Sequence, residues 1–118
     1  MSKERPLTPD ERGTLLRILE AAPADGASEL RAQVDETTVV DGLDAFLDLK
    51  VAESATRCTV PDGHIPVRAL VYGADGEPEG ELLVWVADGY LSAFEFAWTT
   101  DEMPRTFPPA ERIRVEAE

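Results

Sequence analysis

The stretch LLVWVADGYLSAFEFAW, residues 82–98, decides the fold. Two apolar runs flank the dipeptide Asp88-Gly89, which is a strong signal for a two-residue type I′ hairpin turn because both positions accept a positive φ. The runs therefore predict two antiparallel strands over residues 81–87 and 90–98.

A two-residue turn determines which side chains share a face of this hairpin. One face, extended by the preceding strand, is aromatic and polar: Arg68, Tyr72, Trp85, Tyr90, Ser92, Phe94, Phe96 and Trp98. The other face is aliphatic, as a helix-packing surface should be: Val67, Ala69, Val71, Leu82, Val84, Val86, Leu91 and Ala93. Glu95 falls on the aliphatic face, where an unpaired carboxylate is costly. We expect it to meet Arg17, Arg31 or a helix N-terminus, or to act as a perturbed acid or base.

The aromatic face suggests a partner-binding surface, because aromatic residues and Arg are enriched where a partner buries a surface. The register predicts that Arg68 meets Trp85 in a cation–π contact. Two other arrangements remain open for this face. The proline-rich tail, with Phe107 and Ile113, can fold over it, or a second copy of the chain can cover it in a homodimer.

The residues around the hairpin predict the other elements. A helix over residues 7–22 starts with a capping box formed by Thr8 and Glu11, and a second helix covers residues 27–34. Further strands are expected at residues 36–40, 45–51 and 66–73, with a short edge strand at 112–116. Helices followed by consecutive strands predict an α+β fold, with two N-terminal helices packed on a largely antiparallel sheet of about five strands.

Length and charge limit the organisation and the partners. At 118 residues the chain is expected to form a single domain, 1–118, with a helical part (1–35), a sheet (36–98) and a proline-rich tail (99–118). Its 24 acidic and 11 basic residues give a net charge of -13. This charge argues against nucleic acid as a binding partner and favours a basic protein. Selection for solubility, or the codon bias of a GC-rich genome, explains the charge equally well.

Acidic residues gather along the first strands. They form an acidic side of the sheet: Asp41, Asp44 and Asp48. This side is interpreted either as a solvated edge or as a docking surface for Lys and Arg.

No motif specifies a chemistry. Cys58 and His64 are too few for a zinc site, there is no nucleophile elbow or phosphate loop, and no cofactor is predicted. The lone cysteine, the absence of a signal peptide and the lack of a bilayer-spanning run indicate a cytoplasmic protein that does not enter a membrane.

The segment GELLVWVADGYLSAFEFAWTTDEMP, residues 80–104, resembles a group of small acidic proteins of high-GC, actinobacteria-like bacteria. The shared features are a strand, "DG", "LS", a following Glu and "DE-x-P". This resemblance implies no activity, but the size and charge are similar in type to those of immunity proteins that neutralise secreted toxins.

Two hypotheses follow from these features. The first is a non-enzymatic immunity or inhibitor protein that binds a basic, nuclease-like toxin. Its candidate partner-binding residues are Arg68, Tyr72, Trp85, Tyr90, Phe94, Trp98, Asp41, Asp44 and Asp48. The second is a small enzyme or ligand-binding domain that uses the aromatic face, with Glu95 or His64 as acid or base.

Overall fold

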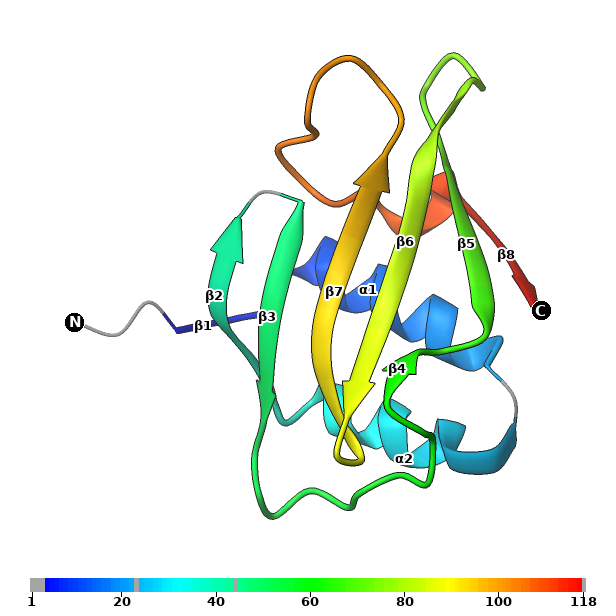
Figure 1. Cartoon of the computed structure of the whole chain (residues 1–118). Coiled ribbons are helices and arrows are strands. Elements are labelled where there is room, and N and C mark those ends of the chain that lie inside the picture. Colours follow the sequence, from blue (N-terminus) through cyan, green and yellow to red (C-terminus); the bar gives the residue numbers. More distant parts are fainter. Residues whose placement is uncertain (1–3, 23, 44, 118) are drawn as a thin grey trace.

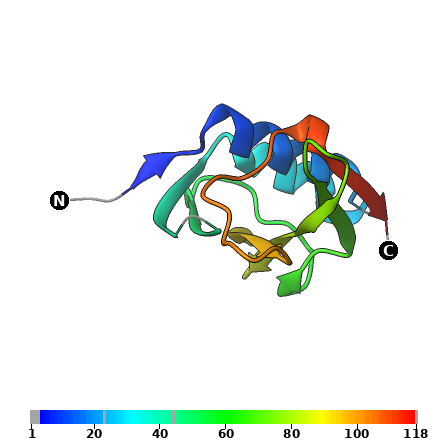
Figure 2. The ribbon, with the colours of Figure 1, turned by 90° about the horizontal axis from the view of Figure 1, so that it is seen from above.

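The chain folds into two layers, seen in a computed structural model that describes residues 4–22, 24–43 and 45–117. Helices α1 (Pro9–Glu20) and α2 (Ala24–Val34) lie on one side of an antiparallel sheet (Figures 1 and 2). The α+β class with two helices on an antiparallel sheet is therefore confirmed.

The sheet has eight strands in the described part of the chain, rather than about five. They are β1 (Arg5–Pro6), β2 (Thr37–Leu43), β3 (Phe46–Val51), β4 (Gly63–His64), β5 (Val67–Tyr72), β6 (Pro78–Ala87), β7 (Tyr90–Trp98) and β8 (Ile113–Ala117). Their order is β1-β2-β3-β7-β6-β5-β8, and β4 also pairs with β6. The count was too low because β1 and β4 have two residues each, too few for an alternating pattern, and because it left out the edge strand expected at residues 112–116, which is β8.

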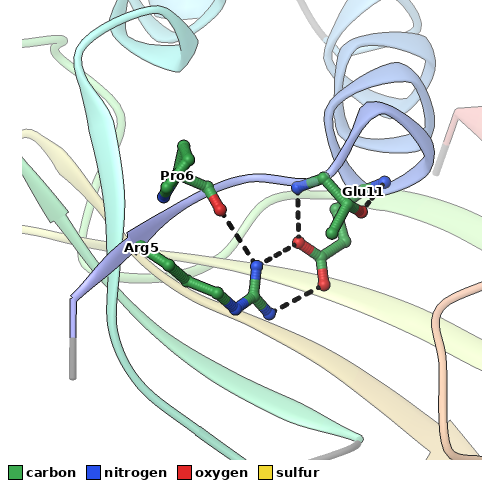
Figure 3. A network of polar contacts seen from close by, with 4 residues as sticks. Arg5, Pro6 and Glu11 are labelled. Atoms are coloured by element: carbon green, nitrogen blue, oxygen red, sulfur yellow. Dashed lines mark hydrogen bonds and ion pairs between the residues drawn. The ribbon is translucent and has the colours of Figure 1, made fainter.

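The start of α1 is fixed by the predicted capping box. The Glu11 N–H donates to Thr8 Oγ1 at 3.1 Å, and the Thr8 N–H donates to Glu11 Oε1 at 2.9 Å. Arg5 reaches across from β1 and donates to both oxygens of the Glu11 carboxylate, at 2.9 and 3.1 Å (Figure 3). Glu11 is only 7% exposed, so this pair attaches β1 to α1 through a nearly buried carboxylate.

The tail packs on the helix side of the sheet. After β7 it passes to the short helix η1 (Ala110–Arg112), which lies beside α1 (Figure 2). The Phe107 ring lies 4.6 Å from the Phe94 ring and 6.2 Å from the Phe96 ring, measured between centroids. Thr14 of α1 donates its hydroxyl to the Pro108 carbonyl at 2.7 Å. The tail therefore completes the helix-covered core.

Gln33 fixes α2 against the turn between β6 and β7. Its side chain is fully buried, and its Nε2 donates to the carbonyls of Thr56 and Gly89 at 2.8 and 2.9 Å. Its Oε1 accepts the Leu91 N–H at 3.0 Å. A single amide thus satisfies three backbone groups, which holds the hairpin tip against the helix layer.

The two outer edges of the sheet differ. At one edge, β1 contributes two residues, one of them Pro6, and β2 carries an irregular register between Val39 and Asp41. At the other edge, the five residues of β8 pair with β5 in regular register and with no other strand in the described ranges. Proline and bulges block strand addition, so only the β8 edge offers a regular ladder.

Candidate interaction face of the sheet

One face of the sheet is turned away from α1, α2 and the tail, and we call it the open face (Figure 2). Strict alternation along the strands defines it. On β3, Leu47, Leu49 and Val51 are buried, whereas the side chains between them are exposed. Strands β5 and β6 show the same alternation. The open face holds Phe46, Asp48, Lys50, His64, Arg68, Leu70, Tyr72, Glu81, Leu83, Trp85, Glu95 and Ala97.

The hairpin turn forms as predicted. Asp88 and Gly89 both have positive φ, 54° and 83°, and Ala87 faces Tyr90 across the turn. Val86 then faces Leu91, also as predicted.

A β-bulge directly after this pair changes the faces of β7. Trp85 faces Ala93 instead of Ser92, so Ser92 has no partner of its own in the ladder. Every later residue of β7 therefore lies on the face opposite to the one predicted from the sequence. Phe94 and Phe96 are therefore buried under the helices, at 0% and 3% exposure, and Glu95 lies on the open face. The prediction that Glu95 belongs to the aliphatic face and Phe94 to the exposed face is wrong.

Trp85 lies at the centre of the open face. Its indole Nε1 donates to Glu95 Oε1 at 3.1 Å. The His64 ring meets the indole edge-on, with centroids 5.5 Å apart and an interplanar angle of 77°. His64 belongs to the short strand β4 and pairs directly with Trp85. The indole is thus held in place from both neighbouring strands.

Phe46 is an exposed aromatic residue on this face, and sequence reasoning missed it. It is 37% exposed and pairs directly with Glu95 across β3 and β7. The signal was present in the sequence. Since Leu47, Leu49 and Val51 point inward, Phe46 must share the outward side with Asp48 and Lys50.

The acidic side predicted for the first strands lies beside these aromatic residues. Asp41 and Asp48 are exposed and directly opposite each other on β2 and β3. Like charges in this position destabilise a sheet. Neither side chain makes an ion pair with another described residue. Asp44 lies outside the described residues.

Arg68 does not meet Trp85, so the predicted cation–π contact is wrong. The loop after β5 is shorter than expected, because the Gly73 N–H donates to the Glu77 carbonyl and β6 begins at Pro78. Leu70 consequently faces Glu81, and Arg68 lies two residues short of the position where it would face Trp85. Arg68 Nε lies 3.6 Å from Glu81 Oε1 instead.

The other predicted partner-binding residues do not gather around Trp85. Tyr72 pairs with Pro78 at one end of β5, and Trp98, 41% exposed, ends β7 opposite Gly80. Tyr90 lies at the opposite end of the hairpin, where Arg57 sits 5.4 Å above its ring. The structure therefore brings together Trp85 with Phe46, His64 and Glu95, and places the predicted aromatic residues elsewhere.

Two cavities lie away from this centre. One, of about 330 Å³, is apolar and lies between the helices and the segment before β5; it is lined by Ala22, Ala27, Leu30, Thr59, Val60, Pro61, Ile65 and Pro66. The other, of about 520 Å³, surrounds the Arg5–Glu11 pair and includes Arg105 and Phe107. Neither is lined by His64 or Glu95.

The geometry defines a class of architecture: a two-layer α+β protein with one sheet face covered by helices and one open. Comparison with known protein families, curated proteins and solved structures finds no match. Among the described residues, no cluster of three or more His, Cys, Asp or Glu is arranged to hold a metal ion. No helix in the described ranges is long and apolar enough to cross a membrane.

Proposed function

We propose that this chain is a non-enzymatic interaction protein that binds a basic protein partner through the open face. In its most concrete form it is a cytoplasmic immunity or inhibitor protein that neutralises a basic, nuclease-like toxin. One observation carries the proposal. The open face, left uncovered by the helices and the tail, presents the exposed Phe46 and the half-buried Trp85 beside carboxylates that have no ion-pair partner among the described residues, in a chain of net charge -13.

The chemistry of the open face matches the residues that contribute most to protein interfaces. Trp85 offers a large apolar area with little rotational freedom, because Glu95 and His64 already hold it. Aromatic anchors of this kind dominate binding energy, while surrounding charges raise the association rate and select the partner. A partner rich in Lys and Arg would be attracted by Asp41 and Asp48.

The test is affinity capture with the full chain as bait in an extract of its own organism, followed by mass spectrometry. We expect a basic protein to be retained by wild type and by Trp98→Ala, but not by Trp85→Ala. Trp98→Ala is the control because it also removes a tryptophan side chain, at the end of β7 and away from the centre of the open face. Retention should fall when salt rises from about 50 to 300 mM. Recovery of no basic protein, or binding indifferent to salt, would contradict the proposal.

A second candidate function, a small enzyme or ligand-binding domain, is favoured by one arrangement. His64 and Glu95, the two candidate acid-base residues, both contact Trp85 on the open face. A thermal-shift screen with small metabolites tests it. A compound that stabilises wild type but not His64→Ala or Glu95→Gln would support this candidate, and a screen in which every compound acts on all three proteins equally would exclude it.

A further inference from the structure

Glu95 occupies an unusual position at the centre of the open face. It is flanked by Phe46, its direct partner on β3, and by Trp85, which donates to its Oε1. The second oxygen, Oε2, has no partner among the described residues. A partly buried carboxylate thus lies between the exposed Phe46 and the half-buried Trp85, and it still has unused acceptor capacity among the described residues.

We infer that this site receives an arginine side chain of the partner, a deduction that rests on the proposed function and specifies what the open face recognises. The guanidinium group would bind the Glu95 carboxylate while its flat faces contact the rings of Phe46 and Trp85. Three features of the site favour this occupant over others.

The first feature is the combination of one carboxylate with aromatic surfaces. A guanidinium is planar, weakly hydrated and able to stack on aromatic rings while donating in the plane to a carboxylate. An ammonium group is a compact, strongly hydrated charge and gains less from the apolar surroundings of Glu95. Both groups feel the net negative charge, but only the guanidinium can also stack on the rings of Phe46 and Trp85.

The second feature is the distribution of neighbouring charges. Asp48 is two residues from Phe46 on the same face of β3, and it faces Asp41. Among the described residues, no basic side chain makes an ion pair with Glu95, Asp41 or Asp48. Arg68 is paired with Glu81 and Arg114 with Glu116, while Lys50 makes no ion pair with any described residue. Negative charge therefore extends from Glu95 toward the β2 side, where a second basic group of the partner would bind.

The third feature is the poor fit of the alternatives. The tail is packed on the other side of the sheet, where Phe107 contacts Phe94 and Phe96. A second copy of the chain would bring another net charge of -13 to this face. Nucleic acid would be repelled in the same way.

The experiment uses the Trp98→Phe variant, in which Trp85 is the remaining tryptophan and its fluorescence reports on the site. Two probes are titrated at about 50 mM salt: an acetylated, amidated peptide of alternating Arg and Gly, and the same peptide with Lys in place of Arg. We expect the arginine peptide to change Trp85 emission and to bind about fivefold or more tightly than the lysine peptide.

Two substitutions in this background localise the preference. Glu95→Gln keeps an oxygen to accept the Trp85 N–H but removes the charge, and it should lower the affinity for the arginine peptide to that for the lysine peptide. Asp101→Asn makes the same charge change on an exposed tail residue, and both affinities should stay within about twofold. Circular dichroism verifies that each variant is folded.

Equal binding of the two peptides, or equal effects of Glu95→Gln and Asp101→Asn, would overturn the arginine site. That outcome would leave salt-sensitive capture of a basic protein intact, so it can be told apart from failure of the proposed function. Failure of the capture experiment would remove the function itself.

Discussion

At the scale of single residues, Glu11 has the most perturbed environment of the described carboxylates. Burial by itself raises the pKa of the Glu11 carboxyl. The hydrogen bonds from Arg5 and from the Thr8 N–H, together with the Arg5 charge, outweigh burial, so the pKa of Glu11 is lowered overall. The folded state therefore binds the proton of Glu11 less tightly than the unfolded chain does.

We predict that Glu11→Gln lowers the free energy of unfolding at pH 7 by about 1–2 kcal/mol, because the variant keeps the capping box but loses the charged pair with Arg5. A lowered folded-state pKa gives stability that is complete above the unfolded pKa, about 4.3, and is lost as pH falls through the folded value. Denaturant unfolding from pH 7 to pH 2 should therefore show the wild-type and variant curves converging at low pH.

Glu20→Gln provides the control for this measurement, since it changes an exposed carboxylate at the other end of α1. Its stability should stay within about 0.5 kcal/mol of wild type. A difference between wild type and Glu11→Gln that persists unchanged to pH 2 would show that ionisation of Glu11 does not contribute.

At the scale of secondary structure, the bulge in β7 decides which side chains form the core and which form the open face. If Ser92 instead paired with Trp85 in a regular ladder, Phe94 and Phe96 would turn toward solvent and Glu95 toward the helices. The bulge avoids burial of an unpaired carboxylate and adds two aromatic rings to the core.

We predict that deletion of Ser92 lowers the free energy of unfolding by no more than about 1 kcal/mol, because it removes the residue without a ladder partner and leaves Ala93 opposite Trp85, with every later residue of β7 on its present face. Ser92→Ala is the control. It keeps the number of residues in β7 and should change the free energy of unfolding, measured by urea denaturation, by less than about 0.5 kcal/mol. A deletion variant that loses more than about 3 kcal/mol or fails to fold would mean that the bulge itself is needed for β6 and β7 to pair.

The bulge also shows how far the sequence predicts the fold. The helix start at Thr8, the turn at Asp88-Gly89 and the inward residues of β5 and β6 follow from local patterns, and all are confirmed. A bulge carries no residue signature of comparable strength, so the prediction assigned the side chains of β7 beyond Leu91 to the wrong faces. One warning was available in the sequence: a carboxylate at an inward position of a regular strand indicates that the strand is not regular.

The centre of the open face was harder to predict than the fold. Trp85 was correctly placed on the exposed face because the side chains of β6 alternate between the two faces as predicted. Phe46 and His64 were missed as neighbours because their contacts with β7 and β6 depend on strand order and on the two-residue strand β4. Such pairings join residues far apart in the chain, and local periodicity does not encode them.

At the scale of the whole molecule, the net charge of -13 acts on stability and binding in opposite directions. Self-repulsion destabilises the folded state at low ionic strength. We therefore predict that the melting temperature rises by about 2–5 °C between 20 and 300 mM NaCl, as screening shortens the range of the repulsion. Over the same interval, affinity for the basic partner should fall.

The pair Asp41 and Asp48 offers a matched test of this effect. The double variant Asp41→Asn/Asp48→Asn should raise the melting temperature at low salt more than Glu53→Gln/Asp101→Asn, which removes the same charge from exposed sites outside the strands. Calorimetry at both salt concentrations measures the difference. Equal gains would indicate that only net charge matters, not the cross-strand contact.

The unequal edges of the sheet set an upper limit on self-association. A molecule with two strand-accepting edges can add copies at both ends without limit, as in a fibril. Here Pro6 and the irregular β2 register close one end, so β8 is the remaining acceptor. If two copies joined there, each would occupy the other's free edge, and growth would stop at a closed pair.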